Sequence, residues 1–189
     1  MEVFFAIGAG AGLATLAGVR AFLPLAVFMF MARIDWLWGF TVKGASLDFL
    51  LTDTAIVVLL ALVVLEVILT RASFLETVER GLRLPAAVIA GGLLMAAAIA
   101  AVVQEPWHWA GLVAGAALAL LGVYVHRGTL QVSEGRDPGP VLDITVLLLA
   151  ALMMLVPPAG YLLLLFMIWL AYRVRRLKRR KYKGLRILA

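Results

Sequence analysis

The chain has 189 residues, a net charge of +6 at pH 7 and no cysteine, and 65% of its residues are hydrophobic, with a mean hydropathy of +1.06. The lack of cysteine excludes disulfides and cysteine-ligated metal or redox sites, and the two histidines are too far apart in sequence for a paired zinc motif, so we expect no metal and no cofactor. A composition this apolar predicts an all-α bundle that crosses a membrane repeatedly. One spanning helix needs about 20 mostly apolar residues, and the chain contains several such stretches.

Six apolar stretches are expected to cross the membrane and to form one domain over residues 1–173. The expected spans are 3–21, 48–69, 85–103, 108–126, 140–156 and 158–173. Pro157 and Pro158 separate the last two, and they fit either a tight turn between two spans or a kink in one long helix. The distribution of charge favours the turn, and therefore six spans.

The first helix is expected to break near Pro24, whose ring clashes with the carbonyl of Arg20 one turn earlier. A cation then lies where the helix opens, as at the broken helices of transporters, and would hold an anionic group or pair with a buried carboxylate. The alternative is that Arg20 reaches the outer membrane interface and that residues 22–33 form a re-entrant or interfacial segment. Thr15, one turn before Arg20, would bond to its own helix.

Glu66 is the charged residue of the second span and has no basic residue three or four positions away. A carboxylate at membrane depth is costly, so it should face the bundle, water or a cation. Its expected partners are Arg71, Arg83 and His126. Two interpretations stay open, a structural ion pair at the interface and a site coupled to protons or cations.

The loop after the second span is expected to carry a short amphipathic helix over residues 74–83, lying in the inner head-group region. Ser73 and Glu76 form a capping box that would start it. Pro85 suits the first turn of the next span, which would separate the two helices. A solvated connector is the alternative.

Small residues recur every four positions in the first, third and fourth spans, and this spacing lets helix backbones approach closely in lipid. The residues are Gly8, Gly12, Ala14 and Gly18, then Gly92, Ala96 and Ala100, then Gly111, Gly115 and Ala119. These three spans are therefore expected to form the centre of the bundle. The similar segments 13–19 and 117–123 begin the two three-span halves, and they suggest an inverted 3+3 repeat.

Asp143 opens the fifth span after a turn-rich segment, and a carboxylate in a first helical turn is stabilised by the helix dipole. The preceding loop, residues 127–139, contains polar residues but no glycine motif for phosphate, and we find no pattern typical of a catalytic triad. No enzymatic activity is expected on this evidence.

Basic residues set the expected orientation. Nine of the 17 Lys and Arg lie between Arg173 and Arg186, so residues 174–189 should form a basic cytoplasmic tail that contacts anionic lipid head groups. Six spans then place both the N- and the C-terminus in the cytoplasm, and four tryptophans near residues 36–38 and 107–109 on the outer side. Topology accounts for the positive charge, so nucleic acid is not an expected partner.

The chain resembles a bacterial membrane-protein family known only as domain of unknown function 4126. The resemblance covers residues 3–180 and is most specific in GLATLAGVRAFLPL (12–25). Further matching segments are LLALVVLEVIL (59–69), LRLPAAVIAGGLL (82–94), GAALALLGVYVHRG (115–128) and the apolar pair ending in YRVRRLKRR. The loop 127–139 is shorter and more charged than the family pattern. The resemblance implies the fold and a cytoplasmic (inner) membrane location, and no activity.

The expected function is that of a small transporter or channel-like permease for a small polar or anionic solute. The expected pathway residues are Arg20, Thr15, Pro24 and Glu66, with Arg83, His126 and Asp143 as secondary candidates. The alternative is a non-transporting subunit that binds lipid or assembles a membrane complex, with a homo-oligomer left open. A membrane enzyme acting on lipid through Glu66, Asp143 or His126 is the third reading.

Overall fold

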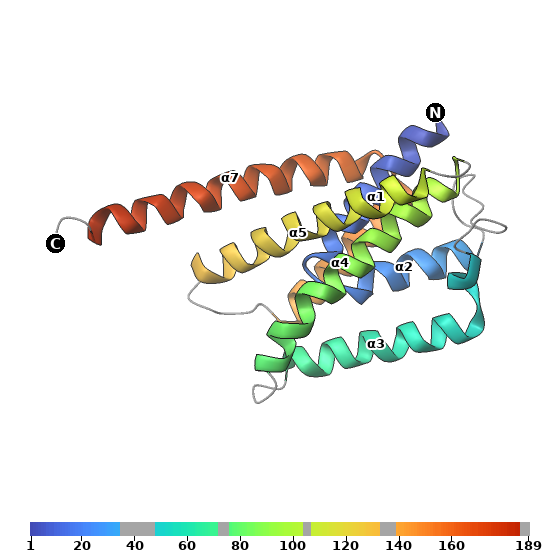
Figure 1. The fold of residues 1–189 in the computed structure, drawn as a ribbon, viewed down its shortest axis with the longest axis horizontal. Helices are drawn as coiled ribbons and strands as arrows, with labels where there is room; N and C mark the ends of the chain where they lie inside the picture. Colours follow the sequence, from blue (N-terminus) through green and yellow to red (C-terminus); the bar gives the residue numbers. More distant parts are fainter. Residues whose placement is uncertain (35–47, 72–75, 104–106, 133–138, 186–189) are drawn as a thin grey trace.

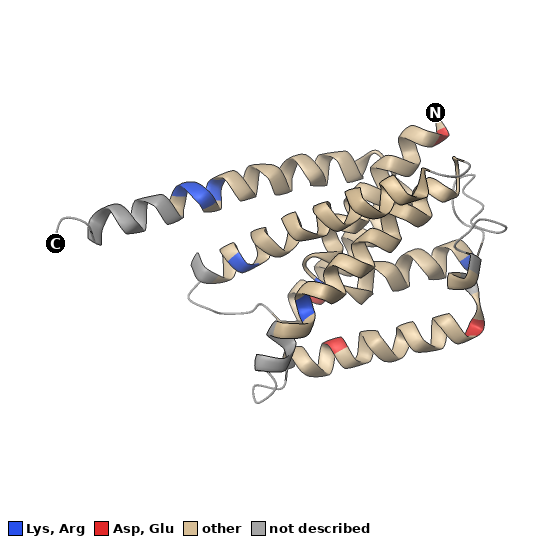
Figure 2. Ribbon diagram, in the orientation of Figure 1, with Lys and Arg blue, Asp and Glu red and all other residues tan. Residues whose placement is uncertain are grey.

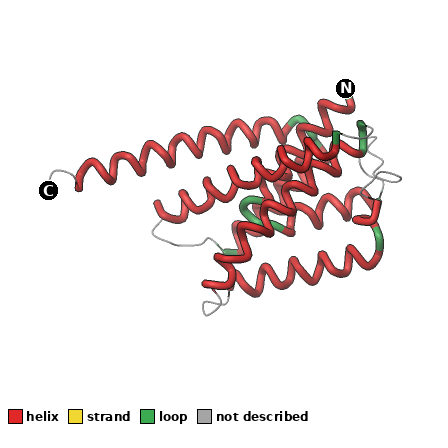
Figure 3. The backbone as a smooth tube through the Cα atoms, in the orientation of Figure 1, coloured by secondary structure: helices red, strands yellow, loops and turns green. Residues whose placement is uncertain are grey.

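The structure, a computed structural model, describes residues 1–34, 48–71, 76–103, 107–132 and 139–185. This described part is all-helical and contains no strand (Figures 1 and 3). Its helices are α1 (Glu2–Ala17), α2 (Phe22–Arg33), α3 (Asp53–Arg71), α4 (Glu76–Ala100), α5 (His108–Val132), α6 (Pro140–Leu155) and α7 (Ala159–Leu185), with a short 3-10 helix η1 (Asp48–Leu51) before α3.

Within the described residues, three helices are long and apolar enough to cross a membrane, and they cover Asp53–Thr70, Gly81–Ala100 and His108–Leu130. Helices α1, α2 and α6 are also apolar but shorter. Many large apolar side chains point outward from the bundle, among them Val58 and Val64 on α3 and Leu162 and Leu165 on α7. An apolar outer surface of this extent indicates a membrane protein, because water-soluble monomers rarely expose such patches.

The first expected span is two helices that run in opposite directions. Helix α1 ends at Ala17 and α2 begins at Phe22, with residues 18–21 as the tip between them (Figure 1). Both ends of α2 touch α3: its N-terminal amides bond to Glu66, and Arg33 pairs with Asp53 at 2.6 Å. Because α2 lies antiparallel to α3, it returns toward the end of the bundle from which α1 came.

The expected break at Pro24 is therefore displaced to residues 18–21. Pro24 lies in the first turn of α2, where backbone N–H groups have no partner within the helix and a missing N–H costs nothing. The break begins at Gly18, whose N–H bonds to Thr15 O at 3.2 Å as α1 ends. Arg20 does not reach the surface of the bundle, because its side chain is only 4% exposed.

The start of α1 and the end of α7 lie at opposite ends of the bundle (Figure 1). Tyr161, at the start of α7, donates a hydrogen bond to Phe4 O at 2.8 Å, so α1 and α7 begin side by side. Helix α7 then runs away from Met1 and passes Gly128, near the end of α5, at Val174. The reversal at 18–21 adds one pass along the bundle to the six that were expected.

Helix α4 begins at Glu76 and continues through Pro85, so the expected separate helix over 74–83 is not present as such. Residues 74 and 75, and the capping residue Ser73, lie outside the described residues. A proline inside a helix removes one hydrogen bond and bends the helix without necessarily ending it, and neighbouring helices compensate for the loss in membrane proteins. The sequence interpretation of Pro85 as a boundary was wrong.

Pro157 and Pro158 form a turn between two helices. Helix α6 ends at Leu155 and α7 starts at Ala159, and the N–H of Val156 bonds to Leu152 O at 2.7 Å as α6 ends. The favoured turn is thus confirmed, and the kinked single helix is excluded.

The predicted centre of α1, α4 and α5 is confirmed by burial and close packing. A Cβ built on Gly91 of α4 would lie 2.6 Å from Ala119 Cβ of α5 and 3.1 Å from Ala14 O of α1. The segments 13–19 and 117–123 meet where Gly18 packs on Gly122. They differ in structure, since the first ends a helix and the second lies inside α5, so the contact gives no support to an inverted repeat.

Candidate functional site

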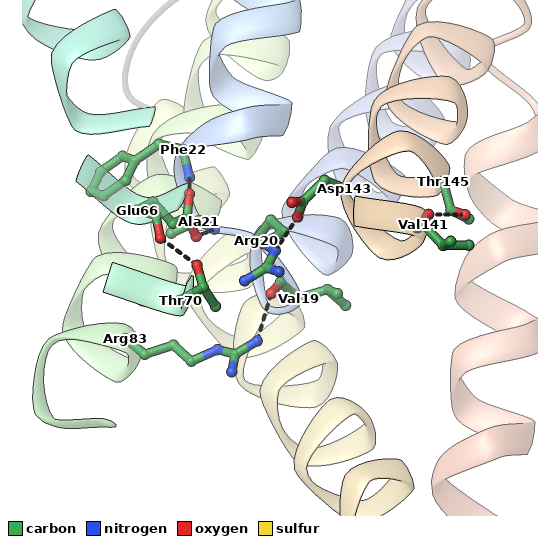
Figure 4. A network of polar contacts seen from close by, with 10 residues as sticks. All are labelled: Val19, Arg20, Ala21, Phe22, Glu66, Thr70, Arg83, Val141, Asp143 and Thr145. Carbon is green, nitrogen blue, oxygen red and sulfur yellow. Dashed lines mark hydrogen bonds and ion pairs between the residues drawn. The ribbon is translucent and has the colours of Figure 1, made fainter. Parts of the chain in front are cut away.

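The tip between α1 and α2 exposes backbone groups that no helix satisfies, and charged side chains from α3 and α4 bind them (Figure 4). The guanidinium of Arg83 donates to Val19 O at 2.8 Å. The N–H groups of Ala21 and Phe22 donate to Glu66 Oε1 and Oε2 at 2.6 and 3.0 Å. Glu66 therefore caps α2 from another helix, with its negative charge at the positive end of the helix dipole.

Arg20 itself pairs with α6. Its Nε donates to Asp143 Oδ1 at 2.5 Å, and the two side chains are 4% and 18% exposed. Asp143 lies in the first turn of α6, so the helix dipole also favours its negative charge. An ion pair this dry stabilises the protein only when both partners are present, because either charge alone would be buried without compensation.

The hydroxyl of Thr70 donates to the carbonyl of Glu66 one turn earlier in α3. Side chains of α3, α4 and α6 together hold the tip (Figure 4). They contact Ala21, Val19 and Arg20, respectively. Figure 2 shows that most of the coloured basic positions lie toward this end of the bundle. Arg33 instead pairs with Asp53, where α2 ends and α3 begins. Unwound backbone is tolerated in a membrane only where protein or water satisfies it, and here charged side chains do so.

A pocket of about 330 Å³ opens beside the tip, between α3 and α4. Its charged lining residues are Arg20, Glu66 and Arg83. The remainder of the lining is apolar and consists of Ala21, Phe22, Leu62, Leu65, Leu69, Leu82, Pro85, Ala86 and Ile89. A concave apolar site with a few convergent polar groups is the usual form of a small-molecule site.

Of the residues predicted from the sequence, the structure brings together Arg20, Glu66, Arg83 and Asp143. Arg20 pairs with a carboxylate inside the bundle, as one interpretation predicted, and that carboxylate is Asp143. Glu66 accepts hydrogen bonds from two backbone amides of the tip, and its expected partner Arg83 lines the same pocket. No three His, Asp or Glu side chains gather as metal ligands anywhere in the described part of the chain.

Three other predicted residues lie outside the pocket. Thr15 is fully buried and donates to Ala11 O at 2.7 Å, which is the bond to its own helix that the sequence suggested. Pro24 is buried in α2, and His126 is buried in α5. Neither of them lines the pocket.

Sequence reasoning missed the apolar wall of the pocket. Leu62, Leu65 and Leu69 line it from α3, and their spacing of three and four residues places them on one helix face beside Glu66. That spacing was visible in the sequence, but in a uniformly apolar helix it does not stand out. The role of the Val19 carbonyl and of the Ala21 and Phe22 amides depends on where the helix ends, which no side-chain pattern marks.

Neither a curated protein nor a solved structure matches the chain. A model of the family described as "Domain of unknown function (DUF4126)" matches residues 7–177, a segment that holds every residue of the site. The helix break, its four charged side chains and the pocket therefore lie within the matched region, and the chain belongs to this DUF4126 family.

Proposed function

We propose that this protein is a small membrane permease whose solute site is the tip between α1 and α2. The observation that carries the proposal is a helix pair interrupted inside the bundle, with ionisable side chains of α3 and α4 on its open backbone groups and a carboxylate of α6 on Arg20. Interrupted helices of this kind form the binding sites of many transporters, where helix N-termini face anionic groups and free carbonyls face cations. The favoured solute is a small polar or anionic molecule.

The protein's own groups occupy the positions that a solute would take. The carboxylate of Glu66 sits on the N-terminal amides of α2, and the guanidinium of Arg83 sits on the Val19 carbonyl. An anion that replaces Glu66 at these amides would release the inner half of α3 from α2. Exchange between Glu66 and the solute is thus the step that opens the site, with Arg20 held in place by Asp143.

The same arrangement supports a topology of five crossings, α3 to α7, preceded by a re-entrant hairpin. Helix α2 has 12 residues, which correspond to about 18 Å, less than the ~30 Å hydrocarbon layer. Because α2 runs back beside α3 to the end from which α1 came, the pair α1–α2 would enter and leave the membrane on the same side. The basic end of the bundle is then cytoplasmic and Met1 lies on the outer side of a bacterial inner membrane. Arg175 and Arg176, both exposed, would face anionic lipid head groups.

Efflux from proteoliposomes tests the permease proposal. Vesicles with the protein should release chloride, acetate or phosphate faster than protein-free vesicles. Glu66→Gln should lower the half-saturating concentration of the transported anion about tenfold. The uncharged side chain of glutamine competes less well than a carboxylate with the solute for the N–H groups at the start of α2. The measurement is initial efflux rate against internal anion concentration.

Asp53→Asn is the matched control, since Asp53 is an exposed carboxylate on the same helix and should leave efflux unchanged. Efflux no faster than from empty vesicles for all three anions would contradict the proposal. So would charge-neutral variants of Arg20 and Glu66 that leave every tested flux at the wild-type rate.

A non-transporting lipid-binding or assembly subunit is the second candidate, and one observation favours it. The pocket is walled mainly by leucine and isoleucine, and Leu65, Leu82 and Ile89 are about half exposed at its mouth. Such a mouth faces the lipid rather than a water-filled axis if α3 and α4 cross the membrane. On this reading, removal of residues 174–189 abolishes association with partners, whereas a permease retains its flux.

A further inference from the structure

We infer that the face where the end of α5 meets α7 binds an anionic phospholipid, with the lipid phosphate held between Arg127 and Arg175. This face lies away from the tip between α1 and α2, so the inference does not depend on transport. It rests on the proposed topology only for the leaflet, the cytoplasmic one, from which the lipid comes.

A close helix contact brings the two arginines to the same side. An added Cβ on Gly128 of α5 would overlap Val174 Cγ1 of α7, so the two helices touch at these residues. Figure 1 shows that α5 and α7 run in the same direction. Because successive residues of a helix are about 100° apart, Arg127, just before Gly128, and Arg175, just after Val174, lie on the same side of the contact. Both arginines are exposed.

The charge of this face is positive. Neither α5 nor α7 contains an aspartate or a glutamate. No carboxylate of the described residues forms an ion pair with Arg127 or Arg175, whereas Arg20 and Arg33 each have such a partner. A guanidinium presents its N–H donors in a planar fork that fits two oxygens of a phosphate. Two forks from neighbouring helices can therefore hold one phosphate.

The depth of the two arginines matches that of lipid head groups. Tyr124 and Tyr172 are 41% and 66% exposed, and each lies about one turn before the arginine of its helix, as tyrosines of an interfacial belt do. Trp109 is exposed near the other end of α5. The rise from Trp109 to Arg127 is about 27 Å at ~1.5 Å per residue, close to the ~30 Å hydrocarbon layer.

Apolar side chains continue the same face toward the membrane centre. Leu120 lies two turns before Arg127, and Ile168 lies two turns before Arg175, so each shares a helix face with its arginine. The two apolar side chains are 45% and 49% exposed. A free phosphate ion would use the arginines alone, whereas a phospholipid contacts the arginines with its phosphate and the apolar pair with an acyl chain. This combination favours the lipid.

The test is photolabelling of the full-length protein in phosphatidylcholine nanodiscs, with a phosphatidylglycerol analogue that carries a diazirine in one acyl chain. Label should saturate and map to the α5 and α7 peptides that contain Leu120 and Ile168. The corresponding phosphatidylcholine analogue should label these peptides at least about tenfold less, because its head group has no net charge. Inorganic phosphate at the same concentration as unlabelled phosphatidylglycerol should not compete.

Arginine variants separate a defined site from a diffuse basic tail. Arg127→Gln and Arg175→Gln should each lower saturable labelling about tenfold, through the loss of charged hydrogen bonds. Arg173→Gln is the matched control, since it removes the same charge at the same depth. Arg173 precedes Val174 and so lies on the other side of α7, with its guanidinium 5.4 Å from the centre of the Trp169 ring. Labelling of this variant should stay near the wild-type level.

Three results would overturn the inference. The first is equal labelling by the two lipid analogues, or competition by inorganic phosphate equal to that of phosphatidylglycerol. The second is an equal loss of labelling in Arg173→Gln and Arg175→Gln, which would mean a diffuse basic tail. The third is wild-type labelling of Arg127→Gln, the result expected if Glu134 or Asp137, outside the described residues, neutralised Arg127. Nanodiscs present lipid to both sides of the protein and need no flux, so failure here would leave the topology and the permease standing.

Discussion

Replacing Arg20 with methionine should destabilise the folded protein by about 3–5 kcal/mol, among the largest effects expected for any side chain in this chain. Arg20 is 4% exposed and its Nε lies 2.5 Å from Asp143 Oδ1. Methionine fills similar space but leaves the carboxylate of Asp143 in a dry environment without its cation. The measurement is the free energy of unfolding in mixed micelles with increasing denaturing detergent.

The surface ion pair at the other end of the bundle is the matched control. Arg33 and Asp53 are 2.6 Å apart, but their side chains are 50% and 83% exposed. Arg33→Met should therefore cost less than about 1 kcal/mol, because solvent screens the pair. The double variant Arg20→Met, Asp143→Met should recover most of the loss, because no uncompensated charge remains. An equal cost for Arg20→Met and Arg33→Met would contradict the buried pairing.

Gly160→Val should destabilise the protein by about 3 kcal/mol, at the upper end of the range for overpacking. A Cβ at Gly160 would overlap the carbonyl oxygen of Gly8 in α1, and neither backbone can move without separating α1 from α7. The same α1 face holds Gly12, where an added Cβ would lie 2.8 Å from Gly160 Cα. The two helices therefore meet backbone to backbone, and the same unfolding assay measures what that contact contributes.

Gly81→Ala separates steric from conformational effects of glycine replacement. Gly81 lies in α4, and an added Cβ would meet nothing within 4 Å. Alanine there should stabilise the helix by up to about 1 kcal/mol. If Gly160→Val proved as harmless as Gly81→Ala, α1 and α7 would not pack as described.

The charged residues of the site were predictable because charge is rare and costly inside apolar helices. Arg20 and Glu66 stand out on this ground alone, and Asp143 was identified for its place in a first helical turn. Their pairing was not predictable. Which carboxylate Arg20 meets depends on its position along the bundle, and the reversal of the chain after Ala17 sets that position.

The reversal itself is weakly encoded. Helix α2 has 12 residues, too few for a crossing, so its sequence fits an interfacial segment as well as the returning arm of a hairpin. What selects the hairpin is tertiary: Glu66 binds the amides at one end of α2, and Arg33 meets Asp53 at the other. Neither contact can be predicted from local sequence patterns, because the partners are many residues apart in the sequence.

Helix packing was easier to foresee. The four-residue spacing of small residues identified α1, α4 and α5 as the centre, since close approach of backbones requires the absence of large side chains. The start of α4 was harder to foresee. Pro85 suggested that a helix begins there, but a proline that fits a first turn can also lie within a longer helix. Patterns thus predicted which helices pack, and were less informative about where each helix starts.

Reagent access to the tip tests the central claim most directly. The chain has no cysteine, so single cysteines can be introduced at Ala21, which lines the pocket, and at Ala14, which is fully buried in the centre. A membrane-impermeant thiol reagent should label Ala21→Cys from one side of the membrane, block anion efflux and leave Ala14→Cys unlabelled. Protection of Ala21→Cys from both sides, equal to that of Ala14→Cys, would mean a dry tip and would contradict the permease.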